Sequence, residues 1–342
     1  MEVLLQIIAI LIFIFMMVSA IVSYGEKEAL ATKRFILVSI LLPLPFLFLA
    51  FVEFGFQYEI SLALLAITLI FIVIGLIPFG QNKAYRQVIP AKRIDERDTM
   101  FSRNELKPGT GNFVDYYKRN PDKKTIDDAW REKPGLMHPG SSQFDPFQFA
   151  SAEAGFETIE ALRNEVNGPV NNKKTDVNPE AITNYVKNWA KKLGALDCGI
   201  TELQDYHLYS VGGRGERYGK KYERQHKFAI AFTVEMDKEM VSAAPQGSIV
   251  MESGQQYLES GKIAIQLGKF IRKLGYEARA HVDGNYKAIC PLVARDAGLG
   301  EIGRMGILMT PKLGPRVRIA VVTTVMSSIV IVVKRLSLSK KR

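Results

Sequence analysis

Cysteine and histidine are scarce in this chain, which has 342 residues but only two cysteines and four histidines. The thiols of Cys198 and Cys290 are far apart in the sequence, whereas zinc and iron–sulfur sites need clustered cysteine or histidine ligands. A single widely spaced pair makes no disulfide framework either. The sequence therefore predicts two reduced cysteines, and we assign no metal ligands.

Several common catalytic signatures are also missing. The chain contains no phosphate-binding GxxxxGK loop, no zinc-binding HExxH helix and no GxSxG nucleophile turn. Residues 298–306 (GLGEIGRMG) match the dinucleotide fingerprint GxGxxG superficially. That interpretation is disfavoured because the stretch follows a predicted short helix, whereas the fingerprint follows the first strand of a βαβ unit. Generic motifs therefore identify no catalytic class.

Charged side chains are nearly absent from three segments near the N-terminus, residues 3–24, 35–52 and 60–79. Each is close to the roughly 20 residues that a helix needs to cross a bilayer, and lipid offers the backbone no other hydrogen-bond partner. We predict three transmembrane helices in a lipid bilayer, with a kink at Pro43 and Pro45. The alternative, a cleaved signal peptide before a buried core, fits poorly because the first segment lacks a basic start and two spans follow it.

Basic residues are placed unevenly around these segments. Lysines and arginines lie between the first and second spans and after the third, while the opposite side receives only the N-terminus and residues 53–57. The positive-inside rule then places the soluble part in the cytoplasm, as part of a multi-pass protein of the inner (cell) membrane. The net charge of +10 would suit nucleic acid, but much of it lies beside the spans and in the KRLSLSKKR tail. Contact with anionic lipid accounts for that charge, so no nucleic-acid partner is expected.

The rest of the chain alternates predicted helices and strands behind a transmembrane anchor of residues 1–80. Residues 81–149 are polar, rich in proline and glycine and weakly periodic, as expected of a linker or wrapping arm. Residues 150–324 have the pattern of a packed domain, and a divergent basic tail follows at 325–342. The alternation predicts an α/β sandwich. Its predicted elements are helices opening at Asn178, running from about 252 to Gly275 and covering 290–297, and strands at 228–236, 276–282 and 316–324.

The glycine-rich stretch carries a specific resemblance. Residues 296–310 (DAGLGEIGRMGILMT), continued by PKLGPRVRIAVVTT, resemble the signature of the corrinoid-dependent reductive dehalogenase family, which is related to epoxyqueuosine reductases. Residues 96–110 (ERDTMFSRNELKPGT) and the helix from Tyr257 to the LGY sequence at 274–276 resemble the same family. The resemblance spans about residues 95–324.

That resemblance implies a fold, a cofactor and a reaction. The fold is the α/β sandwich of nitroreductase-type and vitamin B12-processing proteins, and the cofactor is a cobalamin-type corrinoid. The reaction is the reductive removal of halide from an organohalide. In the family, two 4Fe-4S clusters held by a ferredoxin-like segment downstream supply electrons to the cobalt.

The residues after Thr324 depart from the family pattern. They read VMSSIVIVVKRLSLSKKR and contain no cysteine that could hold a 4Fe-4S cluster. The chain is therefore expected to be truncated before the ferredoxin-like segment, as an interrupted gene, a fragment or a degenerate paralogue. Its electrons would then come from a separate electron-donor protein.

Matching motif to motif assigns candidate catalytic residues by resemblance. The family's tyrosine proton donor falls on Tyr257, its small polar residue on Asp283 or Asn285, and its basic residue on Arg316. An arginine beside a phenol would lower the pKa of the hydroxyl toward the working pH, which suits a proton donor. Each candidate also has a purely structural alternative. Tyr257 would be an ordinary aromatic residue on a helix face, Asp283 and Asn285 would form a turn around Gly284, and Arg316 would be a solvated charge at a strand end.

A second set of residues is assigned to the corrinoid. Glycines let backbone amides approach a bulky macrocycle, and Arg304 could bind a phosphate or carboxamide of the cofactor or cap a turn. His207 lies in DYHLY, whereas a histidine ligand to cobalt would come with DxHxxG, and Ser210 stands in place of the glycine. We expect the corrinoid base-off, without histidine ligation, and His207 as a hydrogen-bonding residue at the surface or in the pocket. The candidates are His207, Gly298, Gly300, Arg304, Met305, Gly306 and Thr310.

Three functions remain open at this point. The first is a membrane-anchored reductive dehalogenase-like oxidoreductase that lacks its own iron–sulfur module. The second is a non-catalytic or degenerate corrinoid-binding remnant, which the missing cysteines favour. The third is an epoxyqueuosine reductase-like enzyme of tRNA modification, which the membrane spans disfavour because a soluble tRNA gains nothing from a fixed membrane site.

Overall fold

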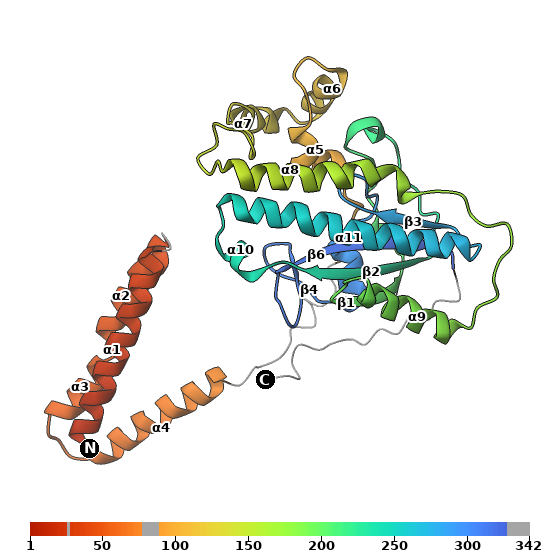
Figure 1. Ribbon diagram of the computed structural model, residues 1–342. Helices are drawn as coiled ribbons and strands as arrows, with labels where there is room; N and C mark the ends of the chain where they lie inside the picture. Colours follow the sequence, from red (N-terminus) through yellow and green to blue (C-terminus); the bar gives the residue numbers. More distant parts are fainter. Residues whose placement is uncertain (26–27, 77–88, 327–342) are drawn as a thin grey trace. The chain divides into compact units, whose positions relative to one another are not determined.

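The computed structural model describes residues 1–25, 28–76 and 89–326 (Figure 1). The chain divides into two compact units, Met1–Val88 and Ile89–Arg342. The end of the third predicted span and most of the predicted basic tail lie outside the described residues.

The first unit consists of long apolar helices. Three helices are long and apolar enough to cross a membrane, Glu2–Gly25, Ala29–Phe51 and Gln57–Leu76. The middle helix is interrupted where a kink was predicted, because Pro43 has no N–H to continue the hydrogen-bond ladder. Its two parts are α2 (Ala29–Leu41) and α3 (Leu44–Phe51), which follow α1 (Glu2–Gly25) and precede α4 (Gln57–Leu76).

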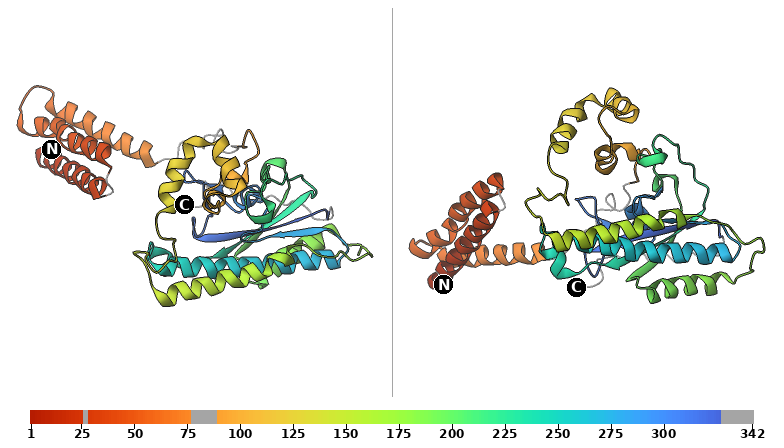
Figure 2. Two further views of the ribbon diagram at one scale, coloured as in Figure 1. Left: turned by 90° about the horizontal axis from the view of Figure 1, so that it is seen from above. Right: turned by 45° about the horizontal axis from the view of Figure 1, so that its top comes forward.

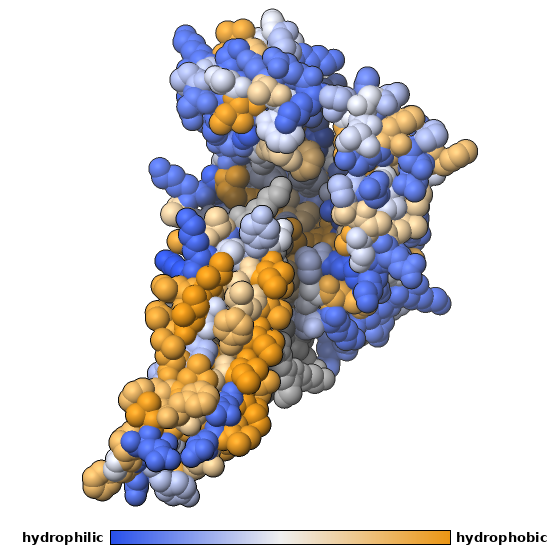
Figure 3. Space-filling view, turned by 90° about the vertical axis from the view of Figure 1, so that its left-hand side faces the viewer, coloured by the Kyte–Doolittle hydropathy of each residue, from blue (hydrophilic) through white to orange (hydrophobic). Residues whose placement is uncertain are grey.

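The surface of this unit is mostly apolar. A small core forms where Leu5 and Ala9 of α1 meet Phe46 and Leu49 of α3. Most other large apolar side chains of these helices are exposed, and they make the elongated hydrophobic surface in Figure 3. Such a surface is far larger than the apolar patches of soluble proteins and suits contact with lipid. The helices therefore support association with a membrane.

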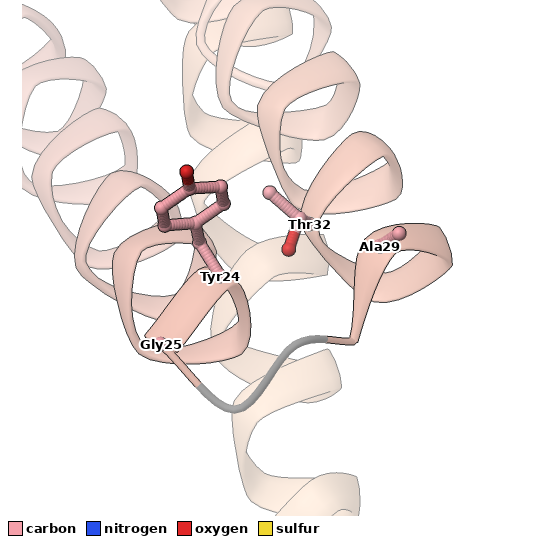
Figure 4. A pocket seen from close by; sticks show the side chains of 4 residues that line it. All are labelled: Tyr24, Gly25, Ala29 and Thr32. Carbon is pink, nitrogen blue, oxygen red and sulfur yellow. The ribbon is translucent and has the colours of Figure 1, made fainter.

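A hollow of about 440 Å³ lies between the end of α1 and the start of α2. Tyr24, Gly25, Ala29 and Thr32 line it, and the Tyr24 ring lies on the side of α1 that faces Thr32 (Figure 4). A second hollow of about 410 Å³ lies in the other unit, beside Gly275. Neither hollow contains a predicted site residue.

The second unit is built on a four-stranded antiparallel sheet with the strand order β1-β2-β6-β3. The central strands β2 and β6 are buried over most of their length, because both faces of the sheet are covered. Their register pairs Ala231 with Val321. The strands are β1 (Asp197–Glu202), β2 (Phe228–Glu235), β3 (Ala278–His281) and β6 (Val317–Thr324).

Helices cover one face of this sheet. In Figure 2, α8 (Pro146–Ala161) and α11 (Gly247–Lys273) run side by side beneath the strands, and α9 (Pro179–Lys192) packs against the same core. α8 and α11 approach closely because glycines meet where they cross. A Cβ on Gly254 of α11 would lie 2.9 Å from the Ala152 carbonyl oxygen of α8.

The opposite face carries a second, smaller core. It is formed by α12 (Cys290–Asp296) and a short hairpin of β4 (Glu301–Ile302) and β5 (Leu308–Met309). Ala229, Ala231 and Val321 of the sheet pack against them. The sheet is thus enclosed between two layers, and the predicted α/β sandwich is confirmed.

Residues 96–131, predicted as part of a linker or wrapping arm, form short helices. α5 (Met100–Asn104), α6 (Gly111–Arg119) and α7 (Pro121–Arg131) gather in a cluster of their own in Figure 1. Phe113, Tyr116 and Tyr117 form their core, and the Thr110 side chain caps α6 by accepting a hydrogen bond from the Phe113 N–H. The helices are too short for a clear sequence period, which is why composition alone suggested an irregular arm.

Candidate functional site

Tyr257 lies on α11, on the side that faces the start of β6. The Arg318 guanidinium lies 4.6 Å from the centroid of the Tyr257 ring, and Phe156 of α8 lies on another side with a ring distance of 6.1 Å. Arg318 Nη2 donates a hydrogen bond of 2.6 Å to Ser253 Oγ. Because Ser253 is four residues before Tyr257, both side chains share one face of the helix, and Arg318 spans them.

The pKa of the Tyr257 hydroxyl is shifted in the direction opposite to the one expected. Burial raises it above the ordinary value, and the charge of Arg318 offsets only part of that effect. A neighbouring arginine does act to lower this pKa, as expected, but the expected net lowering was wrong because removal from water dominates. The hydroxyl stays protonated at neutral pH and makes no hydrogen bond within the described part of the chain, so its proton is available to a ligand.

Arg316, the basic residue predicted by resemblance, is bonded at the end of β2. Its Nη1 donates to Glu235 Oε1 at 2.8 Å and to the Met236 carbonyl oxygen. That placement matches the structural alternative of a charge at a strand end. The structure thus brings Arg318, and not Arg316, to the tyrosine.

Asp283 and Asn285 lie in the turn that follows β3. Gly284 between them has a φ of 66°, so the predicted turn around this glycine is present. Asp283 Oδ2 accepts a hydrogen bond of 3.2 Å from Arg163 Nη2, and Asn285 Oδ1 accepts one of 2.8 Å from Arg279 Nη2. Both side chains are anchored, and the charge of Asp283 is close enough to Tyr257 to act on its pKa.

Two further tyrosines border this region and were missed by the sequence analysis. Tyr209 and Tyr286 stack with their ring centroids 6.5 Å apart and an interplanar angle of 30°. Burial raises the pKa of both hydroxyls, and that of Tyr286 also feels Tyr209, Tyr257 and Asp283. These groups therefore form one aromatic and acidic cluster. No local motif marks Tyr209, which comes from a distant loop.

The glycines of residues 298–306 serve two purposes in the structure. Gly298 and Gly306 have positive φ angles of 81° and 74°, which a residue with a Cβ rarely adopts. A Cβ on Gly300 would lie 2.3 Å from the Met309 carbonyl oxygen, so this glycine lets β4 approach β5. Nothing lies within 4 Å of the position of a Cβ on Gly306, which leaves backbone open at the hairpin turn.

The other cofactor candidates divide between the hairpin turn and the interior. Arg304 and Met305 lie in the turn and are exposed. Thr310 Oγ1 donates a hydrogen bond of 2.9 Å to the Gly314 carbonyl oxygen and accepts one from the Leu313 N–H, so its hydroxyl shapes the next turn. The structure does not bring Thr310 to the open side of the hairpin with Arg304.

His207 is fully buried, which excludes the surface position, one of the two that the sequence left open. Its Nδ1 accepts a hydrogen bond of 3.0 Å from the Gln204 N–H, so Nε2 carries the proton and donates to Asp296 Oδ2 at 2.8 Å. Burial acts to raise the pKa of Asp296. Hydrogen bonds from His207, Arg295 and Tyr206 outweigh this effect and hold that pKa well below its ordinary value. Both ring nitrogens are used inside the protein, as expected for a histidine that does not ligate cobalt.

A corrinoid would need open backbone, polar groups for its amide rim and unsatisfied donors near its reactive face. The turn at Arg304–Gly306 offers the first two. Arg318 Nε is buried and has no hydrogen-bond partner among the described residues. It lies beside the Tyr257 ring, whose hydroxyl is also free to donate. A buried donor without a partner is rare in folded proteins, so Arg318 Nε fits a contact with a ligand.

Curated proteins match part of this chain. It is 41% identical over 98 residues to a tetrachloroethene reductive dehalogenase of Desulfitobacterium hafniense, a stretch that covers 29% of this chain and 17% of that protein. It is 27% identical over 174 residues to a tetrachloroethene reductive dehalogenase of Sulfurospirillum multivorans, covering 43% of this chain and 34% of the relative. The matches thus span about a third or less of these relatives' length. No family model matches the chain.

Solved structures match a larger share of the chain. A catabolic reductive dehalogenase superposes with a TM-score of 0.54 and 21% identity, covering 70% of this chain and 32% of the other. A second structure is described as suggesting a mechanism for B12-dependent dehalogenation. It superposes with a TM-score of 0.53 and 20% identity, and the match covers 70% of this chain and 31% of the other. In the arrangement of its sheet and helices, and in sequence over a shorter stretch, this chain therefore resembles the reductive dehalogenases.

Proposed function

We propose that this protein is a membrane-anchored reductive dehalogenase-like oxidoreductase that binds a corrinoid base-off and removes halide from an organohalide. The contact between Tyr257 and Arg318 carries the proposal, because it sets a protonated phenol beside a fixed positive charge within a dehalogenase-like fold. The matched curated proteins are tetrachloroethene reductive dehalogenases, so a small chlorinated alkene is the first substrate to test.

Replacing a carbon-bound halogen by hydrogen consumes two electrons and one proton and releases a halide ion. A bound corrinoid would supply the reducing electrons. In the proposed mechanism Tyr257 holds the proton at its phenolic oxygen and donates it to the carbon that loses the halogen. Arg318 stabilises the phenolate that remains, since a guanidinium over an aromatic ring attracts the added negative charge.

The remaining candidates take supporting roles in this proposal. We assign Asp283 and Asn285 to the substrate side, and the charge of Asp283 is close enough to Tyr286 to act on its pKa. Backbone at Gly306 would approach the macrocycle, beside Arg304 and Met305. The other cofactor-binding candidates from the sequence, Gly298, Gly300, Thr310 and His207, would act indirectly by shaping the surrounding backbone. Arg316 is kept as a rival to Arg318 for the basic role.

We also propose that a separate protein supplies the electrons. Iron–sulfur clusters bind thiolates, but burial raises the pKa of both the Cys198 and the Cys290 thiols to about 12. Both cysteines are free. Two protonated, separated thiols are poor cluster ligands, so iron and acid-labile sulfide in the purified chain should stay near zero. Stoichiometric iron with absorption near 400 nm would contradict this part of the proposal.

The proposed topology puts the N-terminus outside the cell and the α/β unit in the cytoplasm. It rests on the basic residues that flank one side of the three apolar helices. Fusions at residue 90 test it, because alkaline phosphatase is active only outside the cytoplasm. Phosphatase activity there, without signal from a cytoplasmic reporter, would contradict the orientation.

Turnover of the full-length chain tests the enzymatic proposal. The purified protein is loaded with cobalamin and given tetrachloroethene and a low-potential artificial reductant, and chloride release is measured. We expect release that depends on both cobalamin and protein and that is lost in Tyr257→Phe. Bound cobalamin without chloride release would instead support the alternative of a non-catalytic corrinoid-binding remnant.

A further inference from the structure

The turn between β3 and α12 is held by arginines from three other segments. Its four residues, 283–286, include both polar candidates of the site. The backbone carbonyl oxygen of each of these four residues accepts a hydrogen bond from an arginine guanidinium group. The bonds run from Arg163 Nε to Asp283 (3.0 Å), from Arg217 Nη2 to Gly284 (2.7 Å), from Arg279 Nη2 to Asn285 (3.3 Å) and from Arg217 Nη1 to Tyr286 (3.0 Å).

The three arginines, which we call the arginine clamp, come from separate elements. Arg163 lies in the 3-10 helix Leu162–Val166, Arg217 in the 3-10 helix Gly215–Arg217, and Arg279 in β3. The turn also bonds in return, since Asn285 Nδ2 donates to the Arg163 carbonyl oxygen at 2.8 Å. The clamp therefore fixes the turn from several directions at once.

Charge makes this arrangement costly at Arg279, because its acceptors are the neutral carbonyl and amide oxygens of Asn285. Arg279 is only 8% exposed, and burial together with the charge of Arg217 lowers its pKa to about 10. The other two arginines have carboxylate partners. Arg163 pairs with Glu160 at 2.7 Å and with Asp283 at 3.2 Å, and Arg217 lies 3.8 Å from Glu96. A buried cation that no carboxylate neutralises, as at Arg279, opposes folding. Such unfavourable features are expected where function requires them.

Gly284 is needed for the clamp to close. A Cβ at this position would lie 2.2 Å from Arg163 Cζ, inside the space that the guanidinium occupies. The positive φ of this residue also favours glycine. Glycine at position 284 is therefore required both by the turn and by the guanidinium of Arg163.

We propose that Arg163, Arg217 and Arg279 are positioning residues that hold Asp283 and Asn285 in place relative to Tyr257. This inference rests on the proposed function of that site. A catalytic group gains most from being fixed before substrate arrives, and misplacement by about 1 Å can lower a rate about 100-fold. The clamp supplies that rigidity to a turn that otherwise has few backbone partners of its own.

Hydrogen–deuterium exchange of the full chain in detergent tests the clamp directly. In Arg217→Gln the turn loses two bonds, so amides of residues 283–288 should exchange about tenfold faster while those of β2 and β6 stay unchanged. Arg163→Gln, a milder change at a side chain that is 27% exposed, should act in the same direction. Arg217→Lys should restore part of the protection, since one ammonium can reach one of the two carbonyls.

Arg224→Gln is the matched control. Arg224 also bonds a carboxylate and a carbonyl, Asp205 Oδ1 at 2.8 Å and the Leu203 oxygen at 3.0 Å, but it does not touch the turn. In cobalamin-loaded protein, the clamp variants should lower the turnover number about 10- to 100-fold with little change in cobalamin affinity. The control should change neither quantity.

Each outcome decides between positioning and plain stabilisation. Unchanged exchange at residues 283–288 overturns the clamp, and so does faster exchange throughout the sheet in both glutamine variants. Faster local exchange with unaltered turnover overturns the positioning role. A wild-type chain without turnover would contradict the proposed function alone, and the exchange data would still decide whether the arginines hold the turn.

Discussion

Arg318 lies over the ring of Tyr257 with its guanidinium 4.6 Å from the ring centroid, while Arg316, two residues earlier, is bound to Glu235. The pair combines a proton that burial keeps on the phenol with a charge that stabilises the phenolate after transfer. Neither feature alone makes an efficient proton donor, because a buried phenol resists ionisation and an isolated cation has nothing to donate. Together they support the proposed acid catalysis.

Tyr257→Phe should lower chloride release at least about 100-fold, because only the transferable proton is lost. Cobalamin affinity should stay within about twofold of the wild type, since the ring and its contacts with Arg318 and Phe156 remain. Single-turnover chloride assays and a cobalamin titration of both proteins measure this. Undiminished release by the variant would exclude Tyr257 as the donor.

The pH profile of the wild type provides a separate test of the same residue. Because the pKa of Tyr257 is raised above its ordinary value of about 10, the donor stays protonated at neutral and mildly alkaline pH. Turnover should therefore show no loss from this group between about pH 7 and 9. A fall centred near neutral pH that disappears in the residual activity of Tyr257→Phe would show a lowered pKa instead.

Arg318→Gln and Arg316→Gln separate the two candidate arginines. Removing Arg318 should lower turnover about 10- to 100-fold, because the phenolate loses its charge partner and Ser253 loses its hydrogen bond. Removing Arg316 breaks a half-exposed ion pair with Glu235, which typically changes stability by less than about 1 kcal/mol. A larger loss of turnover in Arg316→Gln would return the basic role to the residue assigned by resemblance.

Gly254→Ala should destabilise the protein although alanine favours helices by about 1 kcal/mol over glycine. The added Cβ would lie 2.9 Å from the Ala152 carbonyl oxygen, and backbone cannot move aside cheaply. We expect a net loss of about 1–3 kcal/mol in the free energy of unfolding. Gly111→Ala in α6 is the control, because nothing lies within 4 Å of its Cβ position, and thermal unfolding should show it unchanged or slightly more stable.

Stability should fall as the pH drops below about 6.5, the ordinary pKa of histidine. Burial and the charges of Arg279, His226, Lys287 and Arg217 hold the pKa of His281 well below that value, and burial also lowers the pKa of His226. The unfolded chain then binds protons that the folded chain does not, so stability is complete above about pH 6.5 and is lost below it.

Each such histidine contributes up to about 1.4 kcal/mol per pH unit. Unfolding by denaturant at pH 7.5 and pH 5.5 measures this slope. His281→Asn should show a smaller slope along with lower stability at every pH. An unchanged slope in that variant would mean that other groups control the dependence.

Sequence patterns predicted the elements whose burial is uniform. The runs at 228–236 and 316–324 each contain a continuous buried stretch, 229–234 and 320–324, and Asn178 caps α9 with its side chain as predicted. β1 was missed because Gly199 interrupts its pattern, yet a Cβ there would lie 2.2 Å from the Ala297 carbonyl oxygen. That glycine is set by a neighbouring helix, which no local pattern reveals.

The site was predictable only in part for a similar reason. Motif matching identified Tyr257 and the turn at 283–285, because both lie in segments that resemble known proteins. It assigned the basic role to Arg316 and did not consider Arg318, because which arginine reaches the tyrosine depends on the sheet and on Glu235. Tyr209 comes from a distant loop and joins the cluster only through the fold.

Binding of cobalamin to the purified full-length chain tests the central claim most directly. The account predicts saturable binding at micromolar concentrations, with the visible spectrum of the base-off form, because both ring nitrogens of His207 are already bonded within the protein. Arg224→Gln should bind as the wild type does. Absence of binding at tens of micromolar cobalamin, in protein that unfolds cooperatively, would contradict the account, and a base-on spectrum would contradict its assignment of the cobalt ligand.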